Sequence, residues 1–357
     1  MNATQVDCDI MESLATSTKL ILMLSIHLIC STISIPILLF TVIKIKNMKL
    51  LHPNTRVILL AYILFLGIHS LSRVVLYGTE LLRFALPRES GCDVLPSLMR
   101  CFIQRLPLNY SMFFIGSSPF MISIERSIST IKISKYEENR AIGPILVVSQ
   151  VILVAFLVFI LYYNTVFSDR IIYYCLATKA GSPWFSYSTF GILAIMQISA
   201  VIILYALKRI NGRVAVHLQS NPDLRARYDV NENLRTITIV FPFCAATCIC
   251  TSTFFAVLIC VIANSSAFDY PTLYTLIDGS LLLPEFALSV PVIIDRMSKK
   301  VAEAKRTTFQ HHMSTTIDCV GNSYFSTIAE SWAVKEGPER SVKKSSLCFR
   351  KSRINIT

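Results

Sequence analysis

The stretch from Cys101 to Arg126 reads CFIQRLPLNYSMFFIGSSPFMISIER, and it has the dimensions of a membrane crossing. A helix rises about 1.5 Å per residue, so the two ends lie about 37 Å apart, enough to reach both surfaces of a hydrocarbon core of about 30 Å. The charged residues Arg105, Glu125 and Arg126 lie near the ends. Such a helix is expected to be surrounded by other helices rather than by lipid.

Six other apolar runs flank this stretch, and each is long enough to cross a bilayer. Of the 357 residues, 53% are hydrophobic and only 16% are charged. Backbone groups cannot stay unpaired in lipid, so every run must be helical. The sequence therefore predicts an all-α membrane protein, a bundle of seven transmembrane helices, at about 20–43, 57–77, 101–131, 142–167, 184–207, 236–263 and 272–294.

The distribution of basic residues predicts the orientation of the bundle. Most of the 34 Lys and Arg residues follow the first, third, fifth and seventh runs. Cytoplasmic loops carry such an excess, which places the N-terminus outside and the C-terminus inside. Glycosylation sequons at Asn2 and Asn264 then both fall outside. The basic residues have no interleaved stacking aromatics, so we expect no nucleic-acid partner.

The chain divides into three regions on this interpretation. Residues 1–19 form an extracellular N-terminus that lacks the features of a cleavable signal, so the first apolar run acts as an uncleaved anchor. Residues 20–294 form the bundle, and 295–357 form a cytoplasmic tail. The tail begins with a short amphipathic basic helix at about 296–309, which would lie on the membrane surface.

Charged residues inside the bundle are candidates for a ligand pocket. By their distances along the second and seventh helices, Arg73 and Asp278 lie at nearly the same depth. We predict that they form an ion pair or together face a ligand, and a purely structural pair is an equally good explanation. For the deeper residues His69 and Glu285, hydrogen bonds inside the bundle are the simpler interpretation.

The inner end of the third helix carries the dipeptide Glu125–Arg126, which suggests a switch. Arg126 would pair with Glu125 at rest and turn toward a bound partner when the helices part. The alternative is an interfacial arginine that extends toward the headgroups. Pro242 and Pro291, near the inner ends of the sixth and seventh helices, are candidate hinges. The alternative is a static kink, which accounts for most prolines inside membrane helices.

Cysteines and histidines give no metal site in this sequence. The cysteines of the sixth run lie at lipid depth with no histidine or acid nearby, so packing explains them better than a metal, and we expect no cofactor. In the tail, Cys348 lies among basic residues and is a candidate for palmitoylation; a plain solvated basic tail is the alternative.

Four stretches of the sequence carry a resemblance to a known family. They are His52-Pro53-Asn54 followed by His69-Ser70, Cys101 to Pro107, Ile124-Glu125-Arg126-Ser127-Ile128-Ser129-Thr130, and Arg227-Tyr228-Asp229-Val230-Asn231-Glu232-Asn233-Leu234-Arg235-Thr236. The region from about Lys19 to Arg296 resembles the nematode serpentine chemoreceptors of the alpha superfamily, most closely the alpha-beta or beta class. That resemblance implies a multi-pass receptor, not an enzyme, in the plasma membrane of sensory neurons, in cilia or dendrites.

The resemblance also implies partners. A small-molecule ligand would enter from outside between helices 3, 5, 6 and 7, and the inner ends of helices 5 and 6 would shift toward a heterotrimeric G protein. A homo- or hetero-oligomer is left open. The basic residues expected to contact the G protein are Lys208, Arg209, Arg213, Arg227 and Arg235. The sequence departs from the rhodopsin pattern, because helix 7 has Ser289-Val290-Pro291 where an Asn-Pro pair and a Tyr are expected.

Rhodopsin-type receptors have a disulfide that ties the loop between helices 4 and 5 to the outer end of helix 3, and this resemblance favours a Cys101–Cys175 bond. Cys8 and Cys92 would then be left to pair with each other. The alternative is that Cys101 is a free apolar cysteine and that Cys92 pairs with Cys175.

Two other functions fit seven apolar helices. A ligand-gated cation channel of the insect odorant-receptor kind has its N-terminus inside, opposite to the orientation predicted here. A small-molecule transporter would show broken helices at matching places in two halves, and the sequence has no internal repeat.

Overall fold

The computed structural model describes most of the bundle and little of the C-terminal tail. The described residues are 4–48, 51–87, 90–132, 139–162, 173–175, 183–218, 224–283, 285–300 and 302–303. The chain separates into two units, Met1–Ser298 and Lys299–Thr357, and the helical bundle belongs to the first. Asn2, Cys348 and half of the predicted tail helix lie outside the described residues.

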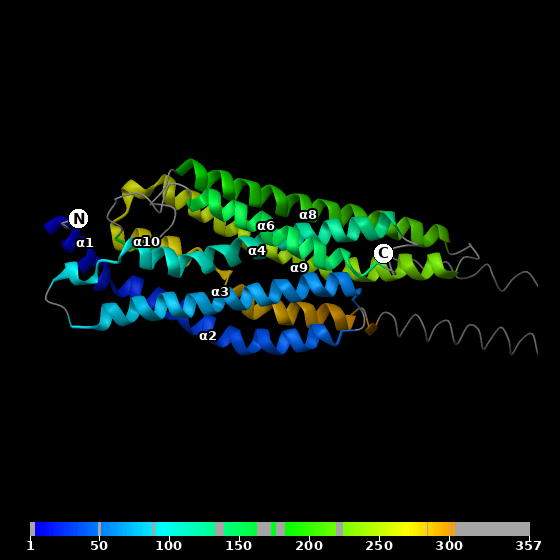
Figure 1. Ribbon diagram of the computed structural model, residues 1–357, viewed down its shortest axis with the longest axis horizontal. Helices are drawn as coiled ribbons and strands as arrows, with labels where there is room; N and C mark the ends of the chain where they lie inside the picture. Colours follow the sequence, from blue (N-terminus) through cyan, green and yellow to red (C-terminus); the bar gives the residue numbers. More distant parts are fainter. Residues whose placement is uncertain are drawn as a thin grey trace, which may run out of the picture. The chain divides into compact units, whose positions relative to one another are not determined.

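Most of the described residues of the first unit are helical, and none of them is in a strand. The long helices run side by side along one direction (Figure 1). They are α2 (Thr18–Lys46), α3 (Pro53–Ala85), α4 (Leu98–Ile131), α6 (Ile142–Tyr162), α8 (Pro183–His217) and α9 (Leu224–Ala263). The shorter elements are α1 (Gln5–Ala15), η1 (Gly91–Val94), η3 (Ser265–Ala267), α10 (Tyr270–Gly279) and a helical segment at 285–300.

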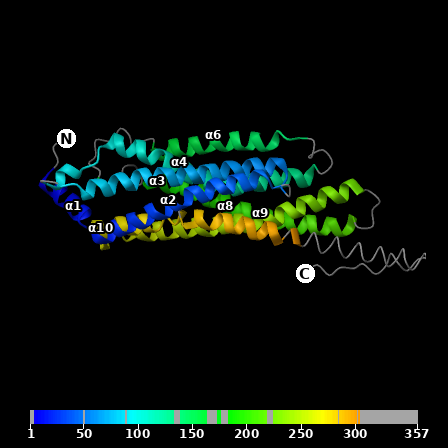
Figure 2. The same cartoon turned by 90° about the horizontal axis from the view of Figure 1, so that it is seen from below.

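Local sequence explains where several helices begin and end. Ser17 caps α2 by accepting a hydrogen bond from the backbone N–H of Leu20, and Lys44 and Lys46 lie in the last turn, where a positive charge suits the helix dipole. Thr4 and Asp7 form a reciprocal capping box at the start of α1. This helix was not predicted, although its Thr-x-x-Asp pattern is a recognisable start signal. It lies at the same end of the bundle as α10 (Figure 2).

Among the described residues, five helices are long and apolar enough to cross a membrane: α2, α3, α6 and most of α8 and α9. The predicted third span is not one of them, because α4 contains buried serines and Asn109. This helix packs against α3, α6, α8 and α9, so its polar groups meet other helices rather than lipid. The central position expected for this helix explains its composition.

Several helices extend beyond the apolar runs from which they were predicted. α3 continues to Ala85, α8 continues to His217, and α9 begins at Leu224. Hydropathy detects only the part of a helix that suits hydrocarbon, whereas the helix itself continues into the aqueous boundary. The polar ends of α8 and α9 carry Asn211 and Asn233, two side chains that belong to the candidate site.

The predicted seventh helix, 272–294, is divided in two. α10 ends at Gly279 with Ser280 as its C-cap, residues 281 and 282 are not helical, and residue 283 is helical again. Pro284 lies outside the described residues, but a proline has no N–H and cannot bond the carbonyl four residues earlier. The break leaves the carbonyl of Leu281 free to accept a hydrogen bond from Arg73 Nη2 at 3.2 Å.

Candidate functional site

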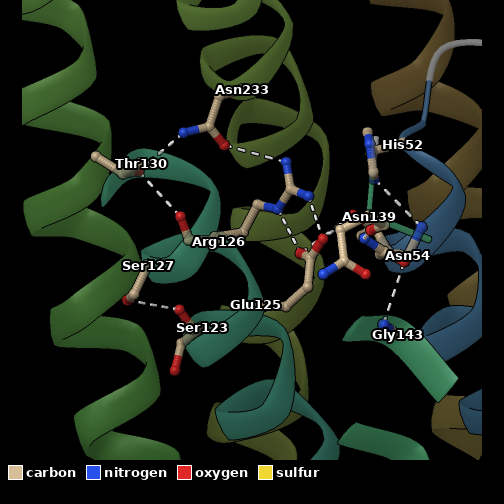
Figure 3. Close-up of polar contacts among 11 residues, drawn as sticks. His52, Asn54, Ser123, Glu125, Arg126, Ser127, Thr130, Asn139, Gly143 and Asn233 are labelled. Carbon is tan, nitrogen blue, oxygen red and sulfur yellow. Dashed lines mark hydrogen bonds and ion pairs between the residues drawn. The ribbon is translucent and has the colours of Figure 1, made fainter. Parts of the chain in front are cut away.

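The candidate site lies around Arg126, near the end of α4. Arg126 and Glu125 are buried, with 1% and 0% of their surfaces exposed. Arg126 donates through Nε and Nη2 to the two carboxylate oxygens of Glu125 (Figure 3). Burying two charges costs several kcal/mol per ion unless each finds further partners. The surrounding helices supply those partners.

Two asparagines connect Arg126 to α8 and α9. Arg126 Nη1 donates to Asn233 Oδ1 at 3.0 Å, and Asn233 Nδ2 donates to Thr130 Oγ1 at 2.8 Å and to Asn211 Oδ1 at 3.1 Å. Asn211 Nδ2 also donates to Thr130 Oγ1 at 3.0 Å. Figure 3 shows the contacts of Asn233 with Arg126 and Thr130. Because Asn211 belongs to α8 and Asn233 to α9, this network holds three helices together around one guanidinium group.

The other side of the ion pair is tied to α3. Thr55 Oγ1 lies 3.2 Å from each carboxylate oxygen of Glu125. One residue earlier, Asn54 accepts from Gly143 N at 3.2 Å and donates to the carbonyl of Asn139 at 2.8 Å, which joins α3 to the start of α6 (Figure 3). The Glu125–Arg126 pair therefore lies where the ends of α3, α4, α8 and α9 converge.

His52 is the N-cap of α3 and lies beside this network. Its Nδ1 accepts a hydrogen bond from Asn54 N at 3.3 Å. Burial, reinforced by the positive charge of Arg126, lowers the pKa of His52 to about 4. The imidazole is therefore neutral at physiological pH, and it adds no positive charge beside Arg126.

Toward the opposite end of the bundle, Asp278 is buried between two other groups. Its Oδ1 lies 3.7 Å from Nη2 of Arg105, and its Oδ2 accepts a hydrogen bond from the hydroxyl of Tyr174. The Arg105 guanidinium also lies 5.6 Å from the centre of the Tyr174 ring. These three residues come from α4, α10 and the segment 173–175.

The predicted Arg73–Asp278 ion pair is replaced by Arg105–Asp278. Arg73 is fully buried, donates to the carbonyl of Leu281 and lies over the Tyr77 ring at 5.3 Å from its centre. The prediction compared depth along the helices, and depth does not give the direction in which a side chain points. The break after α10 also supplies Arg73 with a carbonyl partner that an unbroken helix would not offer.

The other two bundle residues have partners on neighbouring helices. His69 Nδ1 lies 3.2 Å from Ser111 Oγ and 3.3 Å from the carbonyl of Leu108, both on α4. Glu285 Oε1 lies 3.0 Å from Nδ1 of His27, on α2. His69 therefore has hydrogen-bond partners inside the bundle, and Glu285 lies within ion-pair distance of His27.

Two disulfides cover the end of the bundle near Asp278. The structure joins Cys101 to Cys175 and Cys8 to Cys92. The first bond fixes the segment that carries Tyr173 and Tyr174 against α4. The hydroxyl of Tyr173 donates to Asp7 Oδ1 at 2.6 Å. Hydrogen bonds from Thr4 and Tyr173 lower the pKa of Asp7. The hydrogen bond to Asp7 raises the pKa of Tyr173 to about 12.

The remaining predicted residues lie on helix surfaces or within helices. Lys208, Arg209 and Arg213 are exposed on α8, while Arg227 and Arg235 on α9 are partly buried. Pro242 lies inside α9 and Pro291 inside the segment 285–300. Asn264 is exposed just after α9, with its amide donating to the carbonyl of Cys260 at 2.8 Å.

The sequence interpretation gave no role to Asn211, Asn233 or Thr55 as partners of the ion pair, or to Tyr174 as a partner of Asp278. One signal was available: an amide side chain in a membrane helix must find a partner, so Asn211 beside an apolar run was a candidate. Which partner it finds depends on helix rotation, which the sequence pattern leaves open.

Comparison with known proteins identifies the family to which the chain is similar. The model of the serpentine-type seven-transmembrane GPCR family, receptor class ab chemoreceptors, matches residues 5–333. A Caenorhabditis elegans protein, serpentine receptor class alpha/beta-14, is 25% identical over 257 residues. That alignment covers 68% of this chain and 63% of the relative, so the chain spans less than two thirds of that protein.

Proposed function

The chain belongs to the serpentine class ab family of seven-transmembrane chemoreceptors, and from this premise we propose that it binds a small molecule and signals to a heterotrimeric G protein. It is a multi-pass membrane protein of a receptor family rather than of an enzyme family. The proposed orientation places the N-terminus outside the plasma membrane and the C-terminus inside, and the cell would be a sensory neuron.

The observation that carries this proposal is the buried network around Arg126. One guanidinium group connects, through Glu125, Asn233 and Asn211, to α3, α9 and α8. A ligand shifts the equilibrium between two arrangements of these helices only if it binds one of the two better. Separation of α8 and α9 from α4 would break the hydrogen bonds of Asn233 and expose Arg126 to a partner.

The rest of the signalling surface is proposed from charge and helix geometry. Lys208, Arg209 and Arg213 are exposed on α8, beyond the predicted membrane span. With Arg227 and Arg235 of α9 they would form the basic surface that meets the G protein. Pro242 follows Asn233 along α9. It would let the first part of α9, which carries Asn233, bend away from α4.

The proposed domain limits follow the predicted ones. Residues 1–19 would be extracellular, 20–294 the bundle, and 295–357 a cytoplasmic tail with a surface helix near 296–309 and a palmitoylated Cys348. Asn2 and Asn264 would carry glycans. The Cys101–Cys175 and Cys8–Cys92 bonds support an extracellular location for this end, because disulfides persist in oxidising compartments.

The test is second-messenger signalling in cells that express the chain at matched surface levels, across a panel of odorants and metabolites. We expect a ligand-dependent signal in wild type that is absent in Arg126→Ala and retained in Arg100→Ala, whose guanidinium pairs with Glu80 near the opposite end of α4. A ligand-evoked current that survives both Arg126→Ala and blockade of G proteins would contradict the proposal and indicate a channel.

A further inference from the structure

A cavity of about 380 Å³ lies between α8 and α9. Phe190, Gly191 and Ala194 line it from α8, and Phe255, Leu258 and Ile259 line it from α9. Small-molecule sites have volumes of about 300–1,000 Å³, so this one suits a small ligand. It lies toward the ends of α8 and α9 opposite to Asn211 and Asn233.

Two small residues on α8 create the hollow. A Cβ atom built on Gly191 would meet nothing within 4 Å, and Ala194 lies one helical turn further along the same face. The floor is formed by Phe255 and Leu258, which are only 6% and 3% exposed. A hollow with small residues on one wall and buried large ones on the other is a pocket rather than a flat contact between helices.

The cavity opens on the face of the bundle that meets lipid. Ile259 lines it and is 53% exposed, and Gly191 is exposed as well. The neighbouring surface consists of large apolar side chains such as Ile192 and Ile195. Because α8 and α9 are apolar enough to span a membrane, this exposed surface meets hydrocarbon rather than water.

The chemistry of the walls defines the ligand class. The side chains that form the walls are aliphatic or aromatic, and the phenol of Tyr187 is the one polar group among the lining side chains that the structure describes. A charged or strongly hydrogen-bonding ligand would lose its hydration here without replacement, which costs several kcal/mol per group. An apolar molecule already dissolved in the bilayer avoids that cost.

The same two helices carry the asparagines that hold Arg126. Gly191 and Asn211 lie about 30 Å apart along α8, at about 1.5 Å per residue. Near the cavity, the ring of Phe190 stacks on Phe113 of α4 with centroids 5.8 Å apart, and it contacts the ring of Phe255 with centroids 5.2 Å apart. A molecule between α8 and α9 would therefore contact both helices beside the rings that pack α8 against α4 and α9.

We infer that this cavity is a binding site for a small apolar molecule that enters from the bilayer between α8 and α9. The binding itself is independent of the proposed function. Its consequence for signalling deepens that function, because the ligand would contact the two helices whose other ends hold Arg126 through Asn211 and Asn233.

The test is photolabelling of the full-length chain in lipid nanodiscs with a small aliphatic diazirine, followed by mapping of the labelled peptides. We expect saturable labelling of the α8 and α9 residues around Gly191 and Ile259, displaced by excess unlabelled decanol. One methylene group gained or lost in an apolar pocket changes the binding free energy by roughly 1–3 kcal/mol, or the affinity by about 10–200-fold. Gly191→Leu fills the hollow and should lower labelling at least about tenfold.

The matched control is Gly67→Leu. Gly67 also lies within a membrane-spanning helix, and a Cβ atom on it would likewise meet nothing within 4 Å, but it does not line the cavity. Its labelling should equal that of wild type. Labelling that is not saturable, or that falls equally in both variants, would overturn the inference.

A second arm separates a free ligand from membrane lipid. A phospholipid that carries the diazirine in its acyl chain should label the cavity weakly and lose that label when decanol is added. Strong phospholipid labelling that decanol does not displace would show a resident lipid site and overturn the inference. Arg126→Ala should keep saturable labelling while losing G-protein signalling, so failure of the site and failure of the proposed function give different results.

Discussion

Replacing Asn233 with alanine should raise signalling in the absence of ligand. The change removes the amide that contacts Arg126 Nη1 at 3.0 Å, Thr130 Oγ1 at 2.8 Å and Asn211 Oδ1 at 3.1 Å. Alanine suits a helix better than asparagine does, so α9 itself should persist. The perturbation is therefore confined to the network that holds α9 against α4 and α8.

The size of the effect is set by the hydrogen bonds that the substitution removes. A hydrogen bond to a charged group contributes about 1.5–3 kcal/mol, and each neutral one contributes about 0.5–1.5 kcal/mol. Such terms do not add fully within one network, so about 2–3 kcal/mol is a reasonable net reduction in the stability of the inactive state. The proposed active state lacks these hydrogen bonds, and the ratio of active to inactive receptor should rise about 30- to 160-fold.

The assay is ligand-free nucleotide exchange on purified Gα subunits by the full-length chain in nanodiscs. Gln150→Ala is the matched control, because the Gln150 amide on α6 donates to the carbonyl of Phe114 at 2.8 Å and to two serine hydroxyls of α4 rather than to Arg126. It should lower thermal stability without raising exchange. Unchanged exchange in a folded Asn233→Ala protein, or an equal rise in both variants, would refute the reasoning.

Three further predictions concern stability. Cys175→Ser should lower the free energy of unfolding by about 2–4 kcal/mol in non-reducing buffer, and an unchanged unfolding midpoint would count against the Cys101–Cys175 bond. The pKa of His52 is about 4 in the folded chain, below its ordinary value, so the free energy of unfolding should fall as the pH drops from 7 to 5. In His52→Gln it should fall less steeply, and parallel curves of stability against pH for the two proteins would contradict this. Gly143→Ala places a Cβ atom 2.7 Å from the carbonyl oxygen of Asn54 and should cost about 1–3 kcal/mol. Gly67→Ala has open space and should cost much less; equal losses of stability would argue against close packing of α6 on α3.

The sequence predicts helices better than it predicts their ends. Apolar runs identify the parts of α3, α8 and α9 that suit hydrocarbon, but the polar continuations of α8 and α9, which carry Asn211 and Asn233, fall outside such a pattern. The hydropathy of the seventh run stays high across the break after Gly279, because the residues there are leucines and a serine. Hydropathy alone therefore predicts one continuous helix.

The site illustrates the same limit at the level of side chains. The position of Glu125–Arg126 at the end of a helix can be read from spacing along one axis. Its partners Thr55 and Asn233 come from other helices and depend on how each helix is rotated about its own axis. The same dependence explains why Asp278 lies against Arg105 when depth alone had favoured Arg73.

The most direct test of the proposed function is capture of a G protein by the purified chain. Asn233→Ala without ligand should retain a heterotrimer after guanine nucleotide is removed by apyrase and release it when GTPγS is added. Arg126→Ala, reconstituted at the same density, should retain none. If Asn233→Ala retains no heterotrimer, or if Arg126→Ala retains as much as Asn233→Ala does, signalling through Arg126 is contradicted.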